Sequence, residues 1–420
     1  MEDMAMKKIG LIVQRYGENV NGGAEVFAKL IAQKLSEEND ITILTSRALD
    51  YRFWKPELPE GESTENGIKI KRFNHGQKAT GKNIVQQNRG YKGRRLYQKF
   101  YRFLGRPALF LKLFPSAEIT EKNQLKWIEN EGPTMYDLVQ YLKENEFFYD
   151  VFIFVTYLYY PCVAGLLAVP KKSIFIPTMH NEKAAYYPIF KKTMTSAKYL
   201  LFLTESEQSF SNRLFKTENI MQAVVPVGID VQDDFKNNDV LKKYAIVHKY
   251  IAYVGRIDAA KGCDVLVNFF IDFISKNKSD LILVLAGKYS EVFTKHPQII
   301  YTGFISEYDK LQLMKQAEVL VIPSQYESLS LVLLESFACK TPVIVNGKCE
   351  VLKEHILRSN GGWIYENNHD FNKILFSILQ NENNEVKANA GNKYVLEHYT
   401  WQKGLAVLNN AIDYVIATNK

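Results

Sequence analysis

Short apolar runs alternate with amphipathic segments along most of the chain, and polar loops that contain glycine separate them. Apolar runs rich in β-branched residues predict buried strands, and apolar positions spaced by three and four predict helices. The first run, 8–14, leads through a glycine-containing loop into a helix that ends near Ser36. This order of strand, loop and helix predicts a doubly wound α/β fold with parallel strands. We expect further strands at 41–45, 68–73, 150–155, 173–176, 199–204, 221–225, 250–254, 281–285, 299–302, 319–322, 342–345 and 362–365, and helices at 118–130, 135–145, 306–316 and from Trp401.

Two domains are expected, because 420 residues exceed what one hydrophobic core usually organises. Proline and glycine punctuate the stretch 225–230, and a second series of strands, loops and helices begins after it. The boundary is therefore predicted between Val225 and Pro226. Hydrophobic residues make up 46% of the chain and charged residues 24%, which is typical of a globular protein.

The cysteines and the apolar runs bear on the compartment. The four cysteines show no C-x-x-C pair, so neither a disulfide framework nor a zinc site is expected. The first eight residues contain no apolar signal-peptide core, and no apolar run approaches the roughly 20 residues of a transmembrane helix. These features predict a cytoplasmic protein.

Positive charge is concentrated in one segment. Between Glu65 and Glu118 there are 13 Lys and Arg residues and no acidic residue, which leaves 40 basic against 46 acidic residues elsewhere. Within it, 91–114 interleaves aromatic and basic residues, a pattern that can lie on an anionic membrane surface. The alternatives are a solvated helix with a buried aromatic face and a basic wall of an acceptor cleft. No nucleic-acid partner is expected, because no nucleic-acid-binding motif accompanies the patch.

The loop after the strand 250–254 has the chemistry of a diphosphate site. Arg256 and Lys261 lie in it between Gly255 and Gly262. An arginine binds phosphate through two parallel hydrogen bonds and a lysine acts as a point charge, so the pair suits a diphosphate. The loop does not match the Walker A pattern, and we find no Asp-x-Asp pair that would hold a metal. The charge of a leaving diphosphate would then be stabilised by these two cations and by helix dipoles.

Two carboxylates flank a predicted helix N-terminus near Ser328. Glu327 and Glu335 are eight residues apart, about 12 Å if the segment is helical throughout. This separation exceeds the roughly 5 Å of a retaining glycosidase pair but suits the distance from a sugar ring across a diphosphate to a ribose. Glu335 stands in an otherwise apolar helix, so we expect its charge to have a partner. The stretch 323–335 therefore predicts a donor pocket for a nucleotide sugar.

Loops of the first half are also candidates, because ligands of such sheets bind beyond the C-terminal strand ends. Gly22 and Gly23 follow the first strand without forming G-x-G-x-x-G, and either make a tight turn or permit close approach of a phosphate. His180 follows the strand 173–176 and could contact substrate, although a lone histidine is more often structural. Weak candidates for acceptor binding are Tyr157, Tyr159 and Asn181.

Three motifs in this order resemble the retaining GT-B glycosyltransferases of family 4: the glycine pair, Gly-Arg-x-x-x-x-Lys-Gly at 255–262, and two glutamates separated by seven residues. The resemblance covers nearly the whole chain and is weakest over 52–146. It implies a GT-B fold, with two Rossmann-like domains facing a central cleft. The N-terminal, acceptor-side domain would be 1–225 joined by the final helix, 401–420, and the donor-binding domain would be 226–400.

The resemblance also implies roles for single residues. Gly22, Gly23 and Gly255 would lie near the diphosphate, with Arg256 and Lys261 neutralising it. Glu335 would bind ribose hydroxyls and Glu327 the donor sugar, and His180 would lie near the transferred sugar. The backbone of Ser328, Leu329 and Ser330 would meet the sugar or phosphate, and the base would pack near Gly303, Phe304 and Ile305. Family members often carry Gly-Phe-Gly where this chain has Ser328-Leu329-Ser330, which leaves the identity of the sugar open.

The expected enzyme is therefore a hexosyltransferase that uses a UDP- or GDP-sugar, without metal or cofactor. It would act on a glycan or a lipid-linked acceptor with retention, in surface polysaccharide or glycoconjugate synthesis. The membrane contact through 91–114 would make it peripheral at the inner face of the membrane. The alternatives are a nucleotide-sugar epimerase on the same fold and a nucleotide-sugar-binding protein without turnover.

Overall fold

The computed structural model describes residues 6–18, 20, 22–51, 53–76, 121–182, 184–230, 239–289 and 293–419. The chain forms two compact units. Unit 1 comprises Met1–Val225 with Leu405–Lys420, and unit 2 comprises Pro226–Gly404. Along the chain, unit 1 gives way to unit 2 between Val225 and Pro226, the position at which the sequence predicts the boundary.

Unit 1 is built on an eight-stranded sheet in the order β3-β4-β2-β1-β5-β6-β7-β8. All neighbouring strands are parallel except β3, which is antiparallel to β4. Without β3, this is the Rossmann order extended by one strand. The strands are β1 (Lys8–Ile12), β2 (Asp40–Ser46), β3 (Gly61–Glu65), β4 (Ile68–Phe73), β5 (Val151–Val155), β6 (Ser173–Ile176), β7 (Tyr199–Phe202) and β8 (Gln222–Val224).

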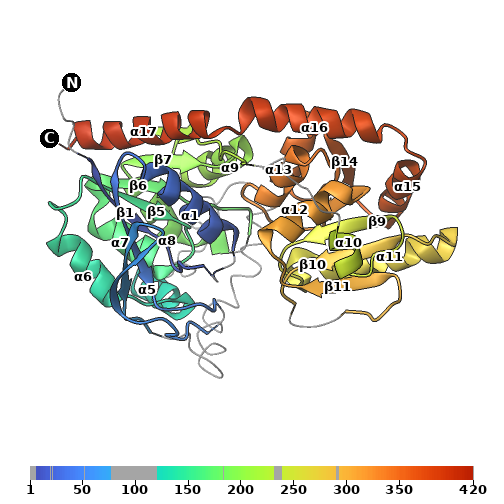
Figure 1. Cartoon of the computed structure of the whole chain (residues 1–420). Helices are drawn as coiled ribbons and strands as arrows, with labels where there is room; N and C mark the ends of the chain where they lie inside the picture. Colours follow the sequence, from blue (N-terminus) through green and yellow to red (C-terminus); the bar gives the residue numbers. More distant parts are fainter. Residues whose placement is uncertain are drawn as a thin grey trace, which may run out of the picture. The chain divides into compact units, whose positions relative to one another are not determined.

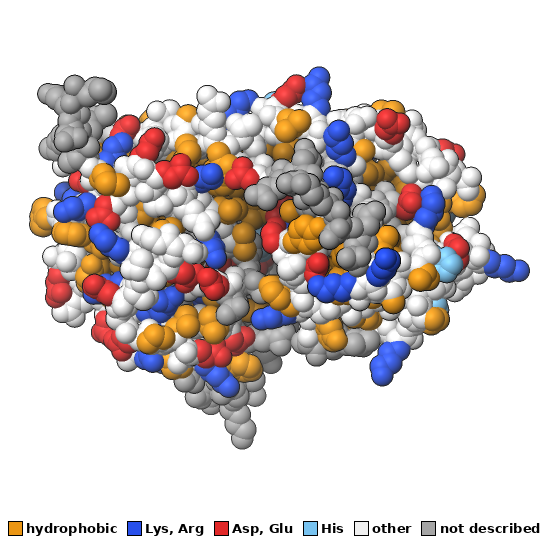
Figure 2. All heavy atoms as spheres, viewed as in Figure 1, with side chains coloured by type: hydrophobic (Ala, Val, Ile, Leu, Met, Phe, Trp, Pro, Cys, Tyr) orange, Lys and Arg blue, Asp and Glu red, His pale blue; other side chains and the backbone are white. Residues whose placement is uncertain are grey.

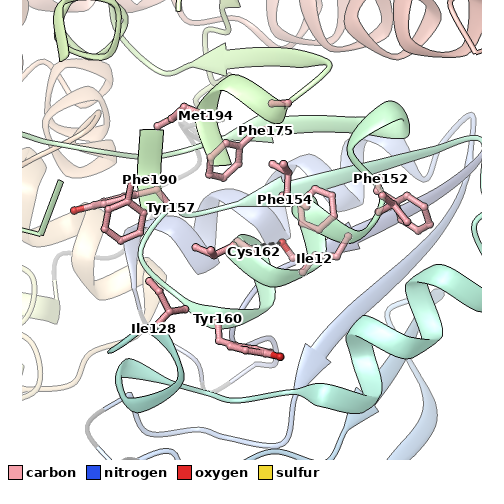
Figure 3. Close-up of a cluster of buried hydrophobic side chains, with 14 of the residues drawn as sticks. Ile12, Ile128, Phe152, Phe154, Tyr157, Tyr160, Cys162, Phe175, Phe190 and Met194 are labelled. Carbon is pink, nitrogen blue, oxygen red and sulfur yellow. Dashed lines mark hydrogen bonds between the residues drawn. The ribbon is translucent and has the colours of Figure 1, made fainter. Parts of the chain in front are cut away.

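Helices flank this sheet (Figure 1). They are α1 (Gly23–Leu35), α5 (Glu121–Glu131), α6 (Tyr136–Glu144), α7 (Tyr160–Ala168), α8 (Pro188–Ser196) and α9 (Glu205–Phe215). One layer is formed by α5, α6, α7 and α8, which pack against one another. Phe152 and Phe154, two positions apart on β5, point into the core beneath this layer together with Phe175 of β6 (Figure 3). The period of two is that of a strand, and the opposite face of β5 is buried as well.

Unit 2 contains a six-stranded parallel sheet in the order β11-β10-β9-β12-β13-β14. Numbered from its own first strand, this order is 3-2-1-4-5-6, that of the Rossmann fold. The strands are β9 (Tyr250–Val254), β10 (Ile282–Ala286), β11 (Ile299–Gly303), β12 (Val319–Ile322), β13 (Val343–Asn346) and β14 (Gly362–Tyr365). The helices are α10 (Asp239–Lys243), α11 (Cys263–Asn277), α12 (Glu307–Gln316), α13 (Leu331–Ala338), α14 (Glu350–Ser359), α15 (Asn368–Leu379) and α16 (Asn384–His398).

Helix α17 (Trp401–Ala417) begins in unit 2 and continues into unit 1. At its start, the Trp401 indole donates to the Asp230 carboxylate at 3.0 Å. Further along, Asp413 pairs with Lys7 at 2.5 Å, and the Tyr414 ring packs edge-on against Tyr199. Most of the helix therefore belongs to unit 1, as the family resemblance implies.

Three details differ from the sequence prediction. β3 was not expected, since its sequence Gly-Glu-Ser-Thr-Glu is polar and it forms the sheet edge. The first strand ends at Ile12, two residues earlier than predicted. Helix α13 begins at Leu331 and not near Ser328, because Ser330 adopts a left-handed conformation with φ of +69° that a right-handed helix cannot include.

No helix in the described ranges is both long enough and apolar enough to cross a membrane. Figure 2 shows basic and acidic side chains interspersed on the face in view. The basic segment 91–114, for which a membrane contact was considered, lies outside the described residues.

Candidate functional site

The strand order of unit 2 reverses direction between β9 and β12, which are direct neighbours. The helices that follow two such strands lie on opposite faces of the sheet, so the loops leaving them diverge and open a crevice for ligands. The loop after β9 is 255–262 and the loop after β12 is 323–330. The structure thus places both halves of the predicted donor motif at this switch point.

The two loops touch at Gly262. This residue has a φ of +77°, and an added Cβ would stand 2.7 Å from the carbonyl oxygen of Pro323. Both the conformation and the space restrict the position to glycine. Gly262 therefore fixes how closely the loop that bears Lys261 approaches the loop that bears Glu327.

Asp258 organises the loop after β9. Its carboxylate accepts a hydrogen bond from the Lys261 backbone N–H at 2.9 Å, which caps the short 3-10 helix Ala259–Lys261. The same carboxylate pairs with the Arg256 guanidinium, and the Tyr253 hydroxyl donates to the Arg256 carbonyl at 2.7 Å. Asp258 was not among the residues predicted from the sequence, although an aspartate three residues before Lys261 is a typical capping residue.

Lys261 and Glu327 form an ion pair. The Lys261 Nζ lies 2.7 Å from Glu327 Oε1, with side chains 31% and 16% exposed. A cation predicted for the diphosphate and a carboxylate predicted for the sugar thus meet at one point. The pair is shielded from bulk solvent enough to be stronger than a surface salt bridge, yet accessible to a ligand.

Glu335 has the partner that its apolar surroundings predict. Lys310 on α12 places its Nζ 2.8 Å from Glu335 Oε2, and also pairs with Glu307. Burial raises the pKa of Glu335, while the Lys310 ammonium acts in the opposite direction. Burial would lower the pKa of Lys310, but attraction to Glu335 and Glu307 outweighs it and the pKa is raised. The two side chains therefore form an ion pair.

The segment 328–330 leads into the N-terminus of α13. Ser330 is the residue before the helix, and its buried hydroxyl oxygen has no hydrogen-bond partner among the residues that the structure describes. Behind the segment, His355 Nε2 lies 2.8 Å from the Leu329 carbonyl oxygen and 0% of the residue is exposed. Since a carbonyl only accepts, Nε2 carries the proton, and Nδ1 can accept from the Tyr394 hydroxyl at 3.3 Å. Burial lowers the pKa of His355 to about 4, so it is a neutral support for the loop.

The ends of β10 and β11 present an aromatic surface. Phe304 follows β11 and its side chain is 63% exposed, unlike that of Ile305, which is buried. The Lys288 ammonium, two residues after β10, lies 5.8 Å from the centre of the Phe304 ring. An exposed ring beside a cation can stack with a nucleobase.

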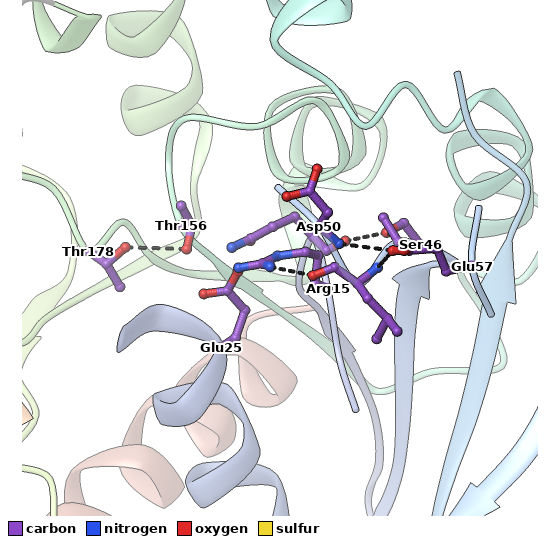
Figure 4. Close-up of polar contacts among 10 residues, drawn as sticks. Arg15, Glu25, Ser46, Asp50, Glu57, Thr156 and Thr178 are labelled. Atoms are coloured by element: carbon purple, nitrogen blue, oxygen red, sulfur yellow. Dashed lines mark hydrogen bonds and ion pairs between the residues drawn. The ribbon is translucent and has the colours of Figure 1, made fainter. Parts of the chain in front are cut away.

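In unit 1, the switch point lies between β1 and β5. Arg15 leaves the end of β1 and pairs with Glu25 of α1, with Nη2 2.5 Å and Nε 2.9 Å from Oε1 (Figure 4). Gly22 precedes α1, and an added Cβ would lie 2.9 Å from the Glu25 carboxyl carbon. Apart from its chain neighbours, no atom of the described residues lies within 4 Å of a Cβ added to Gly23. A Cβ at Gly22 would therefore displace the end of the Glu25 side chain, whereas contacts with described residues do not explain Gly23.

His180 stands on a loop that other side chains hold firmly. Glu207 accepts from the Met179 backbone N–H at 2.6 Å and from the Leu203 N–H at 2.8 Å. Burial raises the pKa of Glu207 to about 8. Glu182 Oε1 lies 3.6 Å from His180 Nδ1, and the same oxygen accepts a hydrogen bond from the Tyr157 hydroxyl.

The three acceptor candidates have different surroundings. The Tyr157 ring is 2% exposed, so its described contacts favour a supporting role through Glu182. Tyr159 packs edge-on against Trp54 with ring centres 5.1 Å apart. Asn181 is exposed and its amide oxygen accepts from Tyr186 at 2.8 Å. Asn181 is thus the most accessible of the three.

The predicted donor residues divide between the units. Unit 2 brings together Arg256, Lys261 and Glu327, while Gly22, Gly23 and His180 belong to unit 1. In the described part of the chain, no group of three or more His, Cys, Asp or Glu side chains is arranged to hold a metal ion.

Comparison with known proteins agrees with this description. Residues 239–394 match the family model of glycosyl transferases group 1. An uncharacterized glycosyltransferase of Methanocaldococcus jannaschii is 29% identical over 168 residues, which cover 36% of this chain and 42% of that protein. The matches span 42% to 63% of the length of three curated relatives.

Solved structures resemble the whole chain. The sucrose-phosphate synthase of Thermosynechococcus elongatus superposes with a TM-score of 0.70 at 14% identity, covering 98% of this chain and 99% of its own. HepE of Anabaena, in complex with UDP-glucose, superposes with a TM-score of 0.64 at 14% identity, with 98% and 99% coverage. The strand orders and these neighbours identify the fold of the chain as GT-B, with two Rossmann-like domains, and the match to the glycosyl transferases group 1 model lies within the second of them.

Proposed function

We propose that this protein is a glycosyltransferase that moves a hexosyl group from a nucleotide diphosphate sugar to a glycan or a lipid-linked acceptor. The observation that carries the proposal is the Lys261–Glu327 pair, which joins two loops at the switch point of unit 2 and whose lysine lies on the same loop as Arg256. The matched family model covers both loops.

The two cations would stabilise the leaving nucleoside diphosphate. A diphosphate carries more negative charge than one carboxylate, so it competes with Glu327 for the Lys261 ammonium. The exposed Arg256 guanidinium offers paired N–H groups to the same phosphates. Because negative charge builds on the diphosphate as the glycosidic bond breaks, these contacts strengthen toward the transition state and accelerate the reaction.

The carboxylates would hold the two ends of the donor substrate. Glu327 accepts hydrogen bonds from sugar hydroxyls, and Glu335 accepts them from the ribose. Between them, the N-terminus of α13 favours negative charge through the helix dipole. The same residues would therefore bind the sugar, the diphosphate and the ribose in that order.

The base and the acceptor are bound elsewhere in the proposal. Phe304 with Lys288 forms the surface on which the base stacks. The structure of HepE with UDP-glucose makes UDP-sugars the first donors to test, with GDP-sugars second. His180, held by its loop contacts, faces the transferred sugar, and the transfer retains the anomeric configuration. Asn181 and Tyr159 contribute to acceptor binding.

Thermal shift with UDP, GDP and their hexose derivatives tests the donor site first, since a ligand that binds the folded state raises Tm. The donor that raises Tm is then incubated with and without a panel of glycan and lipid-linked acceptors. We expect nucleoside diphosphate release that depends on acceptor, and NMR of the product shows whether configuration is retained. An isomerised donor in the absence of acceptor would indicate an epimerase. Binding without consumption across the panel would indicate a binding protein.

A further inference from the structure

The ion pair beneath α13 includes a lysine in an unusual position. Lys310 is only 15% exposed, although lysine is rarely buried, and it lies between two carboxylates. Its partner Glu335 is 18% exposed, whereas Glu307 is 72% exposed and solvated. The pair with Glu335 therefore holds the Lys310 side chain in its buried position, and the solvated pair with Glu307 contributes little to stability.

The lysine opposes the effect of burial on the pKa of Glu335. The charged groups that act on Glu335 in the described chain are Lys310 and Glu307, both on α12. Burial and Glu307 favour the protonated carboxyl, and Lys310 alone among them favours the carboxylate. A protonated carboxyl would donate one hydrogen bond, whereas the carboxylate only accepts.

The contact also fixes the direction of the carboxylate. Lys310 occupies one side of Oε2 at 2.8 Å. A carboxylate has about four acceptor positions on its two oxygens, so a single ammonium leaves room for two further hydrogen bonds. Two adjacent hydroxyls, as on the 2′ and 3′ carbons of ribose, are groups that such an oriented carboxylate binds well.

We propose that Lys310 is a positioning residue of the donor site, which keeps Glu335 in its accepting form and aims it at the two ribose hydroxyls. The inference rests on the proposed function, because it assumes that Glu335 faces the ribose. Selectivity for ribose over 2′-deoxyribose then depends on a lysine of α12, although the carboxylate that binds the ribose lies on α13. A buried acceptor that loses its hydroxyl partner rejects the analogue strongly.

The experiment compares Lys310→Met with Lys315→Met, which removes an exposed lysine from the last turn of the same helix. Calorimetry measures the Kd of UDP, GDP and ADP between pH 5.5 and 8.0. The 2′-deoxy form of the nucleotide that binds most tightly is then measured over the same pH range. For Lys310→Met we expect Kd to rise about tenfold at pH 6 and less at pH 8, because burial then protonates Glu335 as the pH falls. The preference for ribose should fall in parallel. Lys310→Arg should restore most of the affinity, and Lys315→Met should match the unmodified chain.

Two further variants separate positioning from a structural effect. In a Glu335→Gln background, Lys310→Met should change Kd by less than about twofold, since the two act through one group. Lys310→Gln replaces Lys310→Met if the latter does not fold. A Kd and a pH profile unchanged in Lys310→Met, or an equal loss in the Glu335→Gln background, would overturn the inference. If the unmodified chain binds none of the three nucleotides, the proposed function fails and the inference fails with it.

Discussion

Removal of the Lys261 ammonium tests the leaving-group argument. Lys261→Met keeps the length of the side chain and removes a cation that lies 2.7 Å from Glu327. Loss of one preorganised contact to a charge that develops in the transition state typically costs about 2.7–4 kcal/mol. We therefore expect kcat/KM for transfer to fall about 100- to 1,000-fold.

The same change also affects folding, and the two effects have to be measured separately. Without Lys261, the Glu327 side chain, which is 16% exposed, loses its ion-pair partner. This loss costs about 1–3 kcal/mol of unfolding free energy. Urea denaturation measures this loss, and released nucleoside diphosphate measures transfer at a temperature where the variant is folded. Lys261→Arg is the matched control: it keeps the charge in a different geometry and should retain more activity than Lys261→Met. A folded Lys261→Met with kcat/KM within about threefold of the unmodified chain would refute the reasoning.

Four further perturbations follow from the described geometry. Gly262→Ala should lower the unfolding free energy by about 1–3 kcal/mol in urea denaturation, since the φ of +77° and the Pro323 carbonyl both oppose a Cβ; a stability equal to that of the unmodified chain would contradict this. Gly23→Ala should leave stability unchanged or slightly higher, because its Cβ would meet none of the described residues beyond its chain neighbours, yet reduce transfer if a phosphate approaches there; full activity would remove Gly23 from the site. Burial raises the pKa of Glu207 to about 8 from an ordinary 4.5, so its contribution to stability is fully present below about pH 4.5 and is lost as the pH rises to about 8. Glu207→Gln should therefore flatten the dependence of stability on pH over this range, as measured by thermal unfolding. An unchanged pH profile would reject the pKa shift. Phe304→Ala should weaken nucleotide binding about tenfold in calorimetry without changing Tm, since its side chain is 63% exposed; equal affinity would move the base elsewhere.

Local patterns in the sequence were enough to predict most of the fold. Apolar runs located the strands of both sheets because buried parallel strands are apolar on both faces, as β5 and β10 are. The polar edge strand β3 has no such pattern, so its pairing with β4 is visible only in three dimensions. The left-handed Ser330, which delays the start of α13, likewise has no marker in the sequence.

The sequence indicated candidate residues for the donor site, which remain predictions, but it did not indicate how they pair. Motif spacing indicated Lys261, Glu327 and Glu335, and the apolar helix around Glu335 indicated that it has a partner. The identity of that partner depends on how α12 packs against α13, and no spacing in the sequence reveals that Lys310 faces it. The contact of His355 with the Leu329 carbonyl was not predictable either, because the two residues are 26 positions apart in the sequence.

The central claim is that unit 2 binds the nucleotide diphosphate at the loops after β9 and β12. A crystal structure of the chain with the nucleotide diphosphate that raises its Tm most tests this directly. We predict the diphosphate within hydrogen-bond distance of Lys261 and Arg256, and the ribose hydroxyls on Glu335. A nucleotide bound away from these loops, or one whose phosphates contact neither cation, would contradict the account.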